Sequence, residues 1–179
     1  MKITDSNLKW FEGEAEYECH ISLGGFRIGK KMDWKEYYKD GKVMSIMHQK
    51  YLGKSIIIFD IAKQITYSKM FRSKAEIQKL SELPPEKVEE IDRNLVDING
   101  YKCIKVVHSS NNGNVEIKSV QWVDESYAIP YLECRIAEVP TGLVVKSEDW
   151  VKTSKVNYSY KREIKEVKAT EVPDSTFKL

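Results

Sequence analysis

The sequence contains no long apolar run. The longest strongly apolar stretch, Ile56–Phe59, has the length of a strand, far below the roughly 18 residues that a membrane span needs. The first residues, Met1–Asn7, lack the apolar segment found in signal peptides. We therefore expect no transmembrane segment. The protein is either cytosolic or a mature form from which a leader has been removed, and a lipid anchor upstream of residue 1 stays open.

The sequence also has no excess of charge of one sign. It contains 29 basic and 27 acidic side chains, a formal net charge of +2, and the two signs are interleaved along the chain. Nucleic-acid binding needs a clustered basic face, so we exclude a nucleic-acid partner. Apolar residues at 41% and charged residues at 31% are ordinary for a globular protein. With no repeat or linker, residues 1–179 are predicted to form one domain.

Cysteine is scarce. Cys19, Cys103 and Cys134 lack the paired spacing of a zinc or redox site. Two interpretations stay open: three buried small hydrophobic side chains, or one disulfide with a leftover thiol in an oxidising envelope. A nucleophilic cysteine is disfavoured because each thiol lies inside a predicted strand, away from any helix start that would lower its pKa.

Turn signals and alternating apolar residues are abundant. Gly100 supplies a tight entry turn to a hairpin that closes through residues 111–114, because Asn-Gly pairs favour the positive φ of a type I′ turn. Asp40-Gly41 marks a second hairpin. Period-two alternation predicts a meander of antiparallel strands. The expected strands cover residues 11–23, 31–39, 43–51, 55–59, 64–70, 102–108, 115–123, 131–137, 143–151 and 156–167.

One segment has a different periodicity. Residues 73–93 space their apolar side chains as a helix does, and Ser73 followed three residues later by Glu76 has the form of a capping box. Pro84-Pro85 divides the segment. The sequence therefore predicts two short helices here.

Together these elements predict a mainly β (α+β) fold. About ten antiparallel strands cannot lie flat, so we expect a strongly curled, unclosed antiparallel β-barrel. The short helical insert needs an apolar surface and is predicted to cover the concave face. Such an arrangement leaves an apolar space at its mouth, where hydrophobic ligands commonly bind.

Four motifs in order resemble a known family: Phe11–Tyr17, Asn99–Cys103, Gln121–Val123 and Val172–Phe177. The chain resembles a bacterial envelope family of unknown function (DUF4412-like) that is related to the LolA/LolB lipoprotein-carrier fold. The resemblance implies an unclosed barrel covered by short helices, in a protein exported to the periplasm or tethered to a membrane by lipid. Better-known carriers of that fold hold acyl chains between the sheet and the helices.

No residue pattern predicts catalysis or metal binding. The histidines are far apart in sequence, the alternating glutamates of the first strand face water together, and the aspartates are isolated, so no pair is placed for acid–base chemistry. We therefore expect no enzyme activity, no metal and no cofactor. The residues considered are His20, His48, His108, Glu12, Glu14, Glu16, Glu18, Asp97, Asp124 and Asp149.

Aromatic and aliphatic side chains are the candidate ligand-binding residues, because they recur at period two on several strands and could line a cavity. The predicted lining consists of Phe11, Tyr17, Trp34, Tyr38, Met44, Ile46, Leu132, Ile136, Tyr158 and Tyr160.

Two functions follow from these predictions. The first is a non-enzymatic binding protein of the periplasm or outer cell envelope, with the cytoplasm as the alternative location, that holds a lipid or the acyl chains of a lipoprotein. The second is a structural or protein-interaction module with a filled core, which uses an exposed strand edge or its loops. An enzyme at the barrel mouth has only fold analogy in its favour.

Overall fold

Antiparallel strands make up almost all of the regular structure. The computed structural model describes residues 9–23, 26–27, 32–49, 53–70, 73–83, 86–131, 139 and 141–178. The elements are β1 (Gly13–Leu23), β2 (Phe26–Arg27), β3 (Met32–Lys39), β4 (Lys42–Gln49), β5 (Gly53–Asp60), β6 (Ile65–Lys69), β7 (Glu76–Lys79), the 3-10 helix η1 (Leu80–Glu82), β8 (Glu86–Ile98), β9 (Tyr101–Asn111), β10 (Val115–Asp124), β11 (Leu143–Thr153), β12 (Asn157–Ala169) and the 3-10 helix η2 (Asp174–Phe177).

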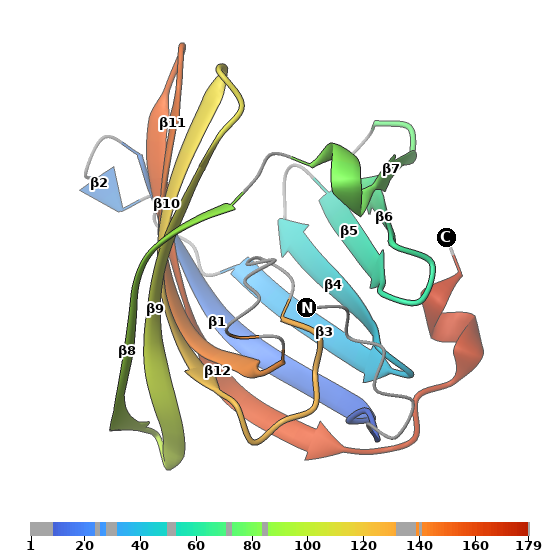
Figure 1. Ribbon diagram of the computed structural model, residues 1–179. Coiled ribbons are helices and arrows are strands. Elements are labelled where there is room, and N and C mark those ends of the chain that lie inside the picture. The colour runs from blue at the N-terminus through green and yellow to red at the C-terminus, as the bar shows by residue number, and fades with distance from the viewer. Residues whose placement is uncertain are drawn as a thin grey trace.

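The described strands form one twelve-stranded sheet in the order β7-β6-β5-β4-β3-β1-β12-β11-β10-β9-β8, with β2 attached to β1. The first long strand, β1, lies between β3 and β12 and joins the two halves of the chain. The sheet curls so strongly that its two wings face each other (Figure 1). Its ends are β7 and β8, so these strands do not close into a barrel. The prediction of a mainly β, curled and unclosed antiparallel sheet is confirmed.

The turn predictions are also confirmed. Asn99 and Gly100 both have positive φ, 54° and 87°, and connect β8 to β9. Gly113, at φ 86°, lies in the turn between β9 and β10, and Asp40-Gly41 connects β3 to β4. These local signals are reliable because few residue types tolerate positive φ.

The predicted helices over residues 73–93 are wrong. That segment contains β7, η1 and the first half of β8. Val88 and Ile91 have helix-like spacing because a bulge after Val88 adds one residue to the strand, so both side chains pack on the same apolar cluster. Ser73 does not cap a helix: its hydroxyl accepts a hydrogen bond from the Met70 N–H at 3.2 Å.

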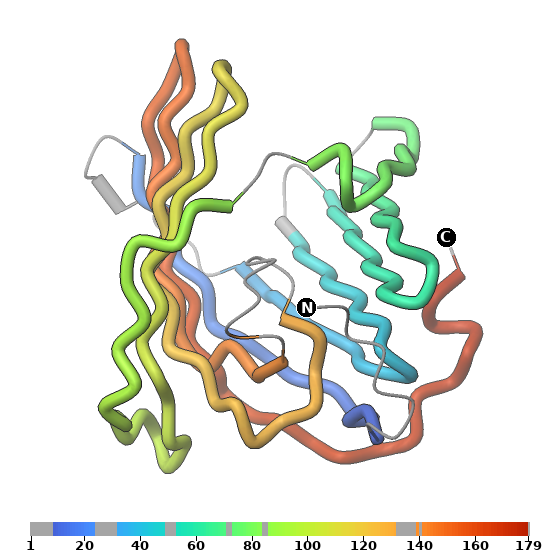
Figure 2. The backbone as a smooth tube through the Cα atoms, viewed as in Figure 1, coloured from blue at the N-terminus to red at the C-terminus, as the bar shows by residue number. Residues whose placement is uncertain are grey.

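On the concave face, described residues of the connection between β10 and β11, and not helices, pack against the sheet. The first part of this connection, residues 125–131, turns from the end of β10 toward the inside of the curl (Figure 2). Phe11 N–H donates to Ala128 O at 2.9 Å, and Gly142 N–H donates to Ile129 O at 2.8 Å, so the described parts of the connection are held by backbone bonds. A predicted strand over residues 131–137 lies almost wholly outside the described residues.

Two apolar clusters lie on the concave side of the sheet. The larger is built on β1, β3 and their neighbours, with Tyr17, Trp34 and Val145 among its buried members. The smaller packs Ile104 and Val106 of β9 against residues of the β10–β11 connection. On β1, residues alternate strictly between buried and half-buried from Gly13 to Cys19, as period two predicts.

The core contains two free thiols. Cys19 and Cys103 are buried and unbonded, which matches the interpretation as small hydrophobic side chains. Burial raises the pKa of the Cys19 thiol to about 11 and that of the Cys103 thiol to about 12. Cys134 lies outside the described residues. Two protonated thiols in the core make stability depend on pH.

We expect the free energy of unfolding to fall as the pH rises from about 8.5 to about 10. In this range the folded chain keeps Cys19 and Cys103 protonated, whereas the unfolded chain releases these protons and gains stability. Urea denaturation at a series of pH values measures the effect. A variant with Cys19→Ala and Cys103→Ala should show a smaller decline; an undiminished decline would contradict thiol burial as its cause.

Candidate functional site

A cavity of about 490 Å³ opens on the concave side, between β3–β6, β12 and the β10–β11 connection. Its walls are mainly aromatic and aliphatic, and its polar residues are few. The apolar lining comes from Ile21, Met32, Trp34, Tyr38, Val43, Met47, Ile57, Phe59, Met70, Leu83, Ile129, Pro130, Tyr131, Gly142, Val144, Tyr158 and Tyr160, and the polar lining from Glu36, Ser45, Thr66 and Arg162. The volume lies within the usual range of ligand sites, about 300–1,000 Å³.

Four of the predicted lining residues, Trp34, Tyr38, Tyr158 and Tyr160, do border this cavity. Tyr17 lies beside it in the core and is fully buried. Phe11 packs edge-on against Tyr38 and Tyr127. Leu132 and Ile136 lie outside the described residues.

Two of the predicted lining residues, Met44 and Ile46 of β4, are not among the residues that border this cavity. Val43, Ser45 and Met47 line the cavity, so Met44 and Ile46 belong to the opposite face of the strand. The alternation was ambiguous because apolar residues occupy both phases of this strand. The polar side chain in the inward phase, Ser45, is tolerated there because its hydroxyl donates to Glu36 Oε1 at 3.0 Å.

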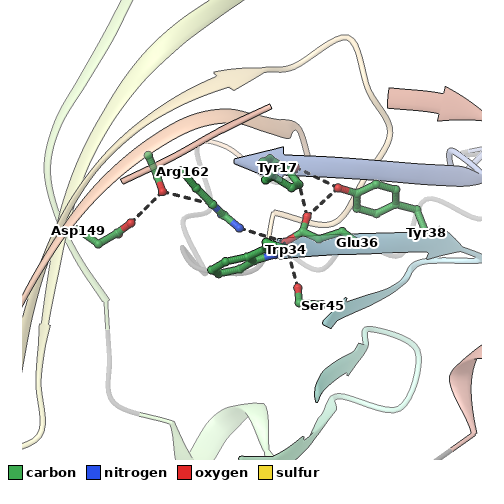
Figure 3. A network of polar contacts seen from close by, with 8 residues as sticks. Tyr17, Trp34, Glu36, Tyr38, Ser45, Asp149 and Arg162 are labelled. Atoms are coloured by element: carbon green, nitrogen blue, oxygen red, sulfur yellow. Dashed lines mark hydrogen bonds and ion pairs between the residues drawn. The ribbon is translucent and has the colours of Figure 1, made fainter. Parts of the chain in front are cut away.

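A buried carboxylate, Glu36, lies at the floor of the cavity (Figure 3). Its Oε1 accepts hydrogen bonds from Trp34 Nε1 at 3.0 Å and from Ser45 Oγ at 3.0 Å. Its Oε2 accepts from the hydroxyls of Tyr38 at 2.6 Å and Tyr17 at 3.3 Å. Glu36 is only 7% exposed. These four side-chain donors fix the position of the carboxylate.

Arg162 of β12 pairs with this carboxylate. Its Nη1 donates to Glu36 Oε1 at 3.0 Å, and its Nε donates to Ser147 Oγ at 3.2 Å. The guanidinium carbon lies 4.6 Å from the centre of the Trp34 ring and 5.2 Å from that of Tyr17. Arg162 is 3% exposed. The planar guanidinium is therefore held by an ion pair, a hydroxyl and two rings at once.

A second carboxylate, Asp149 of β11, stands behind Arg162 (Figure 3). Ser147 Oγ donates to Asp149 Oδ2 at 2.8 Å, and Ser119 Oγ donates to Oδ1. Asp149 is 1% exposed. One polar network thus runs from β3 across β12 and β11 to β10, beneath an otherwise apolar cavity.

This network shifts the pKa of the tyrosines within it. Burial raises the pKa of Tyr17 and of Tyr38 well above the ordinary value, and the nearby Glu36 carboxylate raises both further. Both hydroxyls therefore stay protonated at neutral pH and remain donors to Glu36. Neither tyrosine is poised to act as a base.

No sequence motif singles out the charged members of this network. Asp149 looks isolated in the sequence, and neither Glu36 nor Arg162 belongs to a recognisable pattern. A signal does exist: each of the three occupies the buried phase of its strand, as the alternation in β3, β11 and β12 shows. A charged residue in a buried phase is expensive and is usually paired.

The histidines do not come together. His20 Nε2 lies 2.7 Å from Glu18 Oε1, and the buried His108 Nδ1 lies 3.1 Å from Glu86 Oε2. Within the described part of the chain, no group of three or more metal-ligating side chains is close enough to hold a metal ion. The same part contains no helix with the length and apolarity needed to cross a membrane.

No protein-family model and no curated protein matches this chain. Among solved structures it is similar to PNGF-II, with a TM-score of 0.53 and 16% identity over 91% of this chain and 29% of PNGF-II. A DUF1329 family protein from Desulfovibrio piger superposes with a TM-score of 0.41 and 9% identity, over 95% of this chain and 90% of that protein. This chain thus spans less than a third of PNGF-II. At such identity the likeness shows the fold alone, and the DUF4412-like assignment stays a prediction.

We expect Arg162→Met to lower the free energy of unfolding by about 3–5 kcal/mol, because it leaves the buried Glu36 carboxylate without its guanidinium. Urea denaturation measures this loss. The matched control is Lys161→Met, one residue away, which removes an exposed cation that lies 2.9 Å from Glu148 and should cost less than about 1 kcal/mol. Equal losses of unfolding free energy in the two variants would show that the buried ion pair stabilises the fold no more than the exposed one does.

Proposed function

We propose that this protein binds a ligand with an apolar body, such as a lipid or the acyl chains of a lipoprotein, in the concave cavity. The observation that supports this most is the cavity of about 490 Å³ with mainly aromatic and aliphatic walls. A side-chain-filled interior, which the alternative function requires, leaves no such space. Apolar pockets with a few convergent polar groups are the usual form of small-molecule sites.

The expected energy of such binding is substantial. Each methylene group transferred from water into an apolar site contributes about 0.8 kcal/mol. A chain that buries about ten methylene groups gains about 8 kcal/mol before the costs of association and ordering are subtracted. Trp34, Phe59 and Tyr160 are large flat partners for such a chain.

The binding is proposed to proceed without chemistry. Glu36 is engaged by four neighbouring side chains and by Arg162 and is therefore a poor general base. The raised pKa values of Cys19 and Cys103 disfavour the thiolate that nucleophilic catalysis needs. No alternative acid–base pair borders the cavity among its described lining residues.

The proposed location is the periplasm or the outer cell envelope. Support for it comes from the resemblance to envelope proteins of the LolA/LolB type over four motifs in order. Cytoplasmic binding of the same ligand class is the alternative.

A second candidate function is a protein-interaction module. One observation favours it: the terminal strand β8 exposes Leu95 and Val96 at 64% and 44%, and exposed sheet edges can pair with an extended segment of a partner. The bulges in β8 oppose this interpretation, because they interrupt the regular edge that such pairing uses.

Native mass spectrometry of gently purified protein, followed by organic extraction, tests the first proposal. A stoichiometric adduct that is released on denaturation and identified as lipid supports it and names the ligand class. A bare mass that stays bare after incubation with envelope lipids overturns it and favours the interaction module.

We expect Thr66→Trp to weaken the binding of an alkyl probe such as dodecanol about tenfold or more, because Thr66 borders the cavity and the indole fills part of it. Calorimetric titration measures the affinity. The control is Tyr67→Trp, the next residue of β6, whose side chain lies on the opposite face of the strand. Equal effects of the two substitutions would place the probe outside the cavity.

A further inference from the structure

The acceptor sites of the Glu36 carboxylate, at the floor of the cavity, are occupied by the protein itself (Figure 3). Five side chains donate hydrogen bonds to its two oxygens, at distances of 2.6–3.3 Å. A carboxylate has about four lone-pair sites, so five donors occupy all of them. A ligand group that donates hydrogen bonds therefore finds no acceptor site on Glu36. The five donors are Tyr17, Trp34, Tyr38, Ser45 and Arg162.

The guanidinium beside this carboxylate is engaged as well. Arg162 donates to Glu36 Oε1 at 3.0 Å and to Ser147 Oγ at 3.2 Å. The rings of Trp34 and Tyr17 lie 4.6 Å and 5.2 Å from its central carbon. A polar head that moved to this floor would lose its hydrogen bonds to water, and an anionic head would compete with Glu36 for the guanidinium. The end of a ligand that reaches the floor is therefore best apolar.

Exposure rises along one row of the cavity wall, from this floor to an apolar rim. Glu36 of β3, Ser45 of β4 and Ile57 of β5 are cross-strand neighbours. Glu36 is 7% exposed, Ser45 is half-buried and Ile57 is 36% exposed. Adjacent strands lie about 4.8 Å apart, so Ile57 is about 10 Å from Glu36 along the sheet.

A second side chain extends this rim. Met70, directly after β6, also borders the cavity and is 42% exposed. Among the described large apolar side chains that are exposed, Ile57 and Met70 are the two that line the cavity. Covering their apolar surface is favourable. The rim therefore suits the apolar body of a ligand, and a polar head beyond it stays in water.

The volume of the cavity matches a single alkyl chain. A methylene group occupies about 30 Å³, close to the share of a water molecule in liquid water. The cavity of about 490 Å³ therefore holds about 16 methylene groups when it is filled. One chain of the length of dodecanol fits this space, whereas two such chains exceed it.

We propose that the cavity binds one alkyl chain, with its methyl end toward Glu36 and its head at the rim formed by Ile57 and Met70. This inference rests on the proposed function and names its ligand class, which is the single-chain amphiphiles. Selection acts on the chain and not on the charge of the head, because the head remains in water, which screens charges.

Calorimetric titration with dodecanol, dodecanoate and dodecylammonium at neutral pH tests the inference, because these probes share one chain and differ in the charge of the head. We expect one molecule of each to bind per protein chain, with three dissociation constants that agree within about threefold. Decanol should bind about tenfold more weakly than dodecanol, because it buries two methylene groups fewer.

Ile57→Thr tests the path of the chain over the rim. The substitution keeps a β-branched side chain at an exposed position, so the fold should persist. We expect dodecanol to bind at least about threefold more weakly, because apolar contact surface is lost. The matched control is Ile56→Thr, the preceding residue of β5, whose side chain lies on the opposite face and which should leave the affinity unchanged. If Ile57→Thr fails to fold, Met70→Gln, similar in length but polar, makes the same test.

The outcomes separate this inference from the proposed function. A preference of more than about threefold for either charged head overturns the placement of the head at the rim. Two dodecanol molecules per protein chain overturn the single-chain assignment. Both results leave the apolar binding site standing. Equal losses of affinity in Ile57→Thr and Ile56→Thr overturn the path over the rim. Absence of binding by all three probes overturns the proposed function and this inference together.

Discussion

The pairing of β1 with β12 is the constraint on which the whole arrangement depends. Every strand before residue 80 belongs to one wing of the sheet and every strand from β8 to β12 to the other, and β1 with β12 is the seam between them. The Glu36–Arg162 ion pair bridges this seam over Tyr17, because Glu36 lies opposite Ala15 and Arg162 opposite Cys19 on the two sides of β1. The buried ion pair between Glu36 and Arg162 therefore strengthens the pairing of β1 with β12.

A buried ion pair at this position is costly, because both charged groups lose their hydration when the chain folds. Buried ion pairs often stabilise a fold less than well-packed apolar side chains of the same size would. Here the cost is reduced because Trp34, Tyr38 and Ser45 donate to the carboxylate, and Ser147 accepts from the guanidinium. These hydrogen bonds offset part of the desolvation cost of both charged groups at the floor of the cavity.

The sequence predicted what depends on local rules and missed what depends on long-range pairing. The turn at Asn99-Gly100 could be predicted because it requires only residues that tolerate positive φ. The strand β1 could be predicted because it buries only one of its faces. The failed helix prediction at Val88 and Ile91 arose because a bulge shifts strand periodicity from two to three. Met44 and Ile46 could not be told from Val43 and Met47 as lining residues, because apolar residues occupy both phases of β4 and only the bond from Ser45 to Glu36 decides between them. Glu36 and Arg162 are 126 residues apart, and no local pattern links them.

The cavity exists because the curled sheet encloses more space than the side chains on its concave face occupy. An eight-stranded barrel can be filled by its own side chains, whereas a longer sheet encloses more space than its lining can occupy. Over the wing of β8–β11, Tyr131 and Val139 of the β10–β11 connection pack on Ile104 and Val106. Over the other wing, β3–β6 present Trp34 and their neighbours to the hollow. The hollow therefore lies against β3 and β12, and the charged residues Glu36 and Arg162 at the seam form its floor.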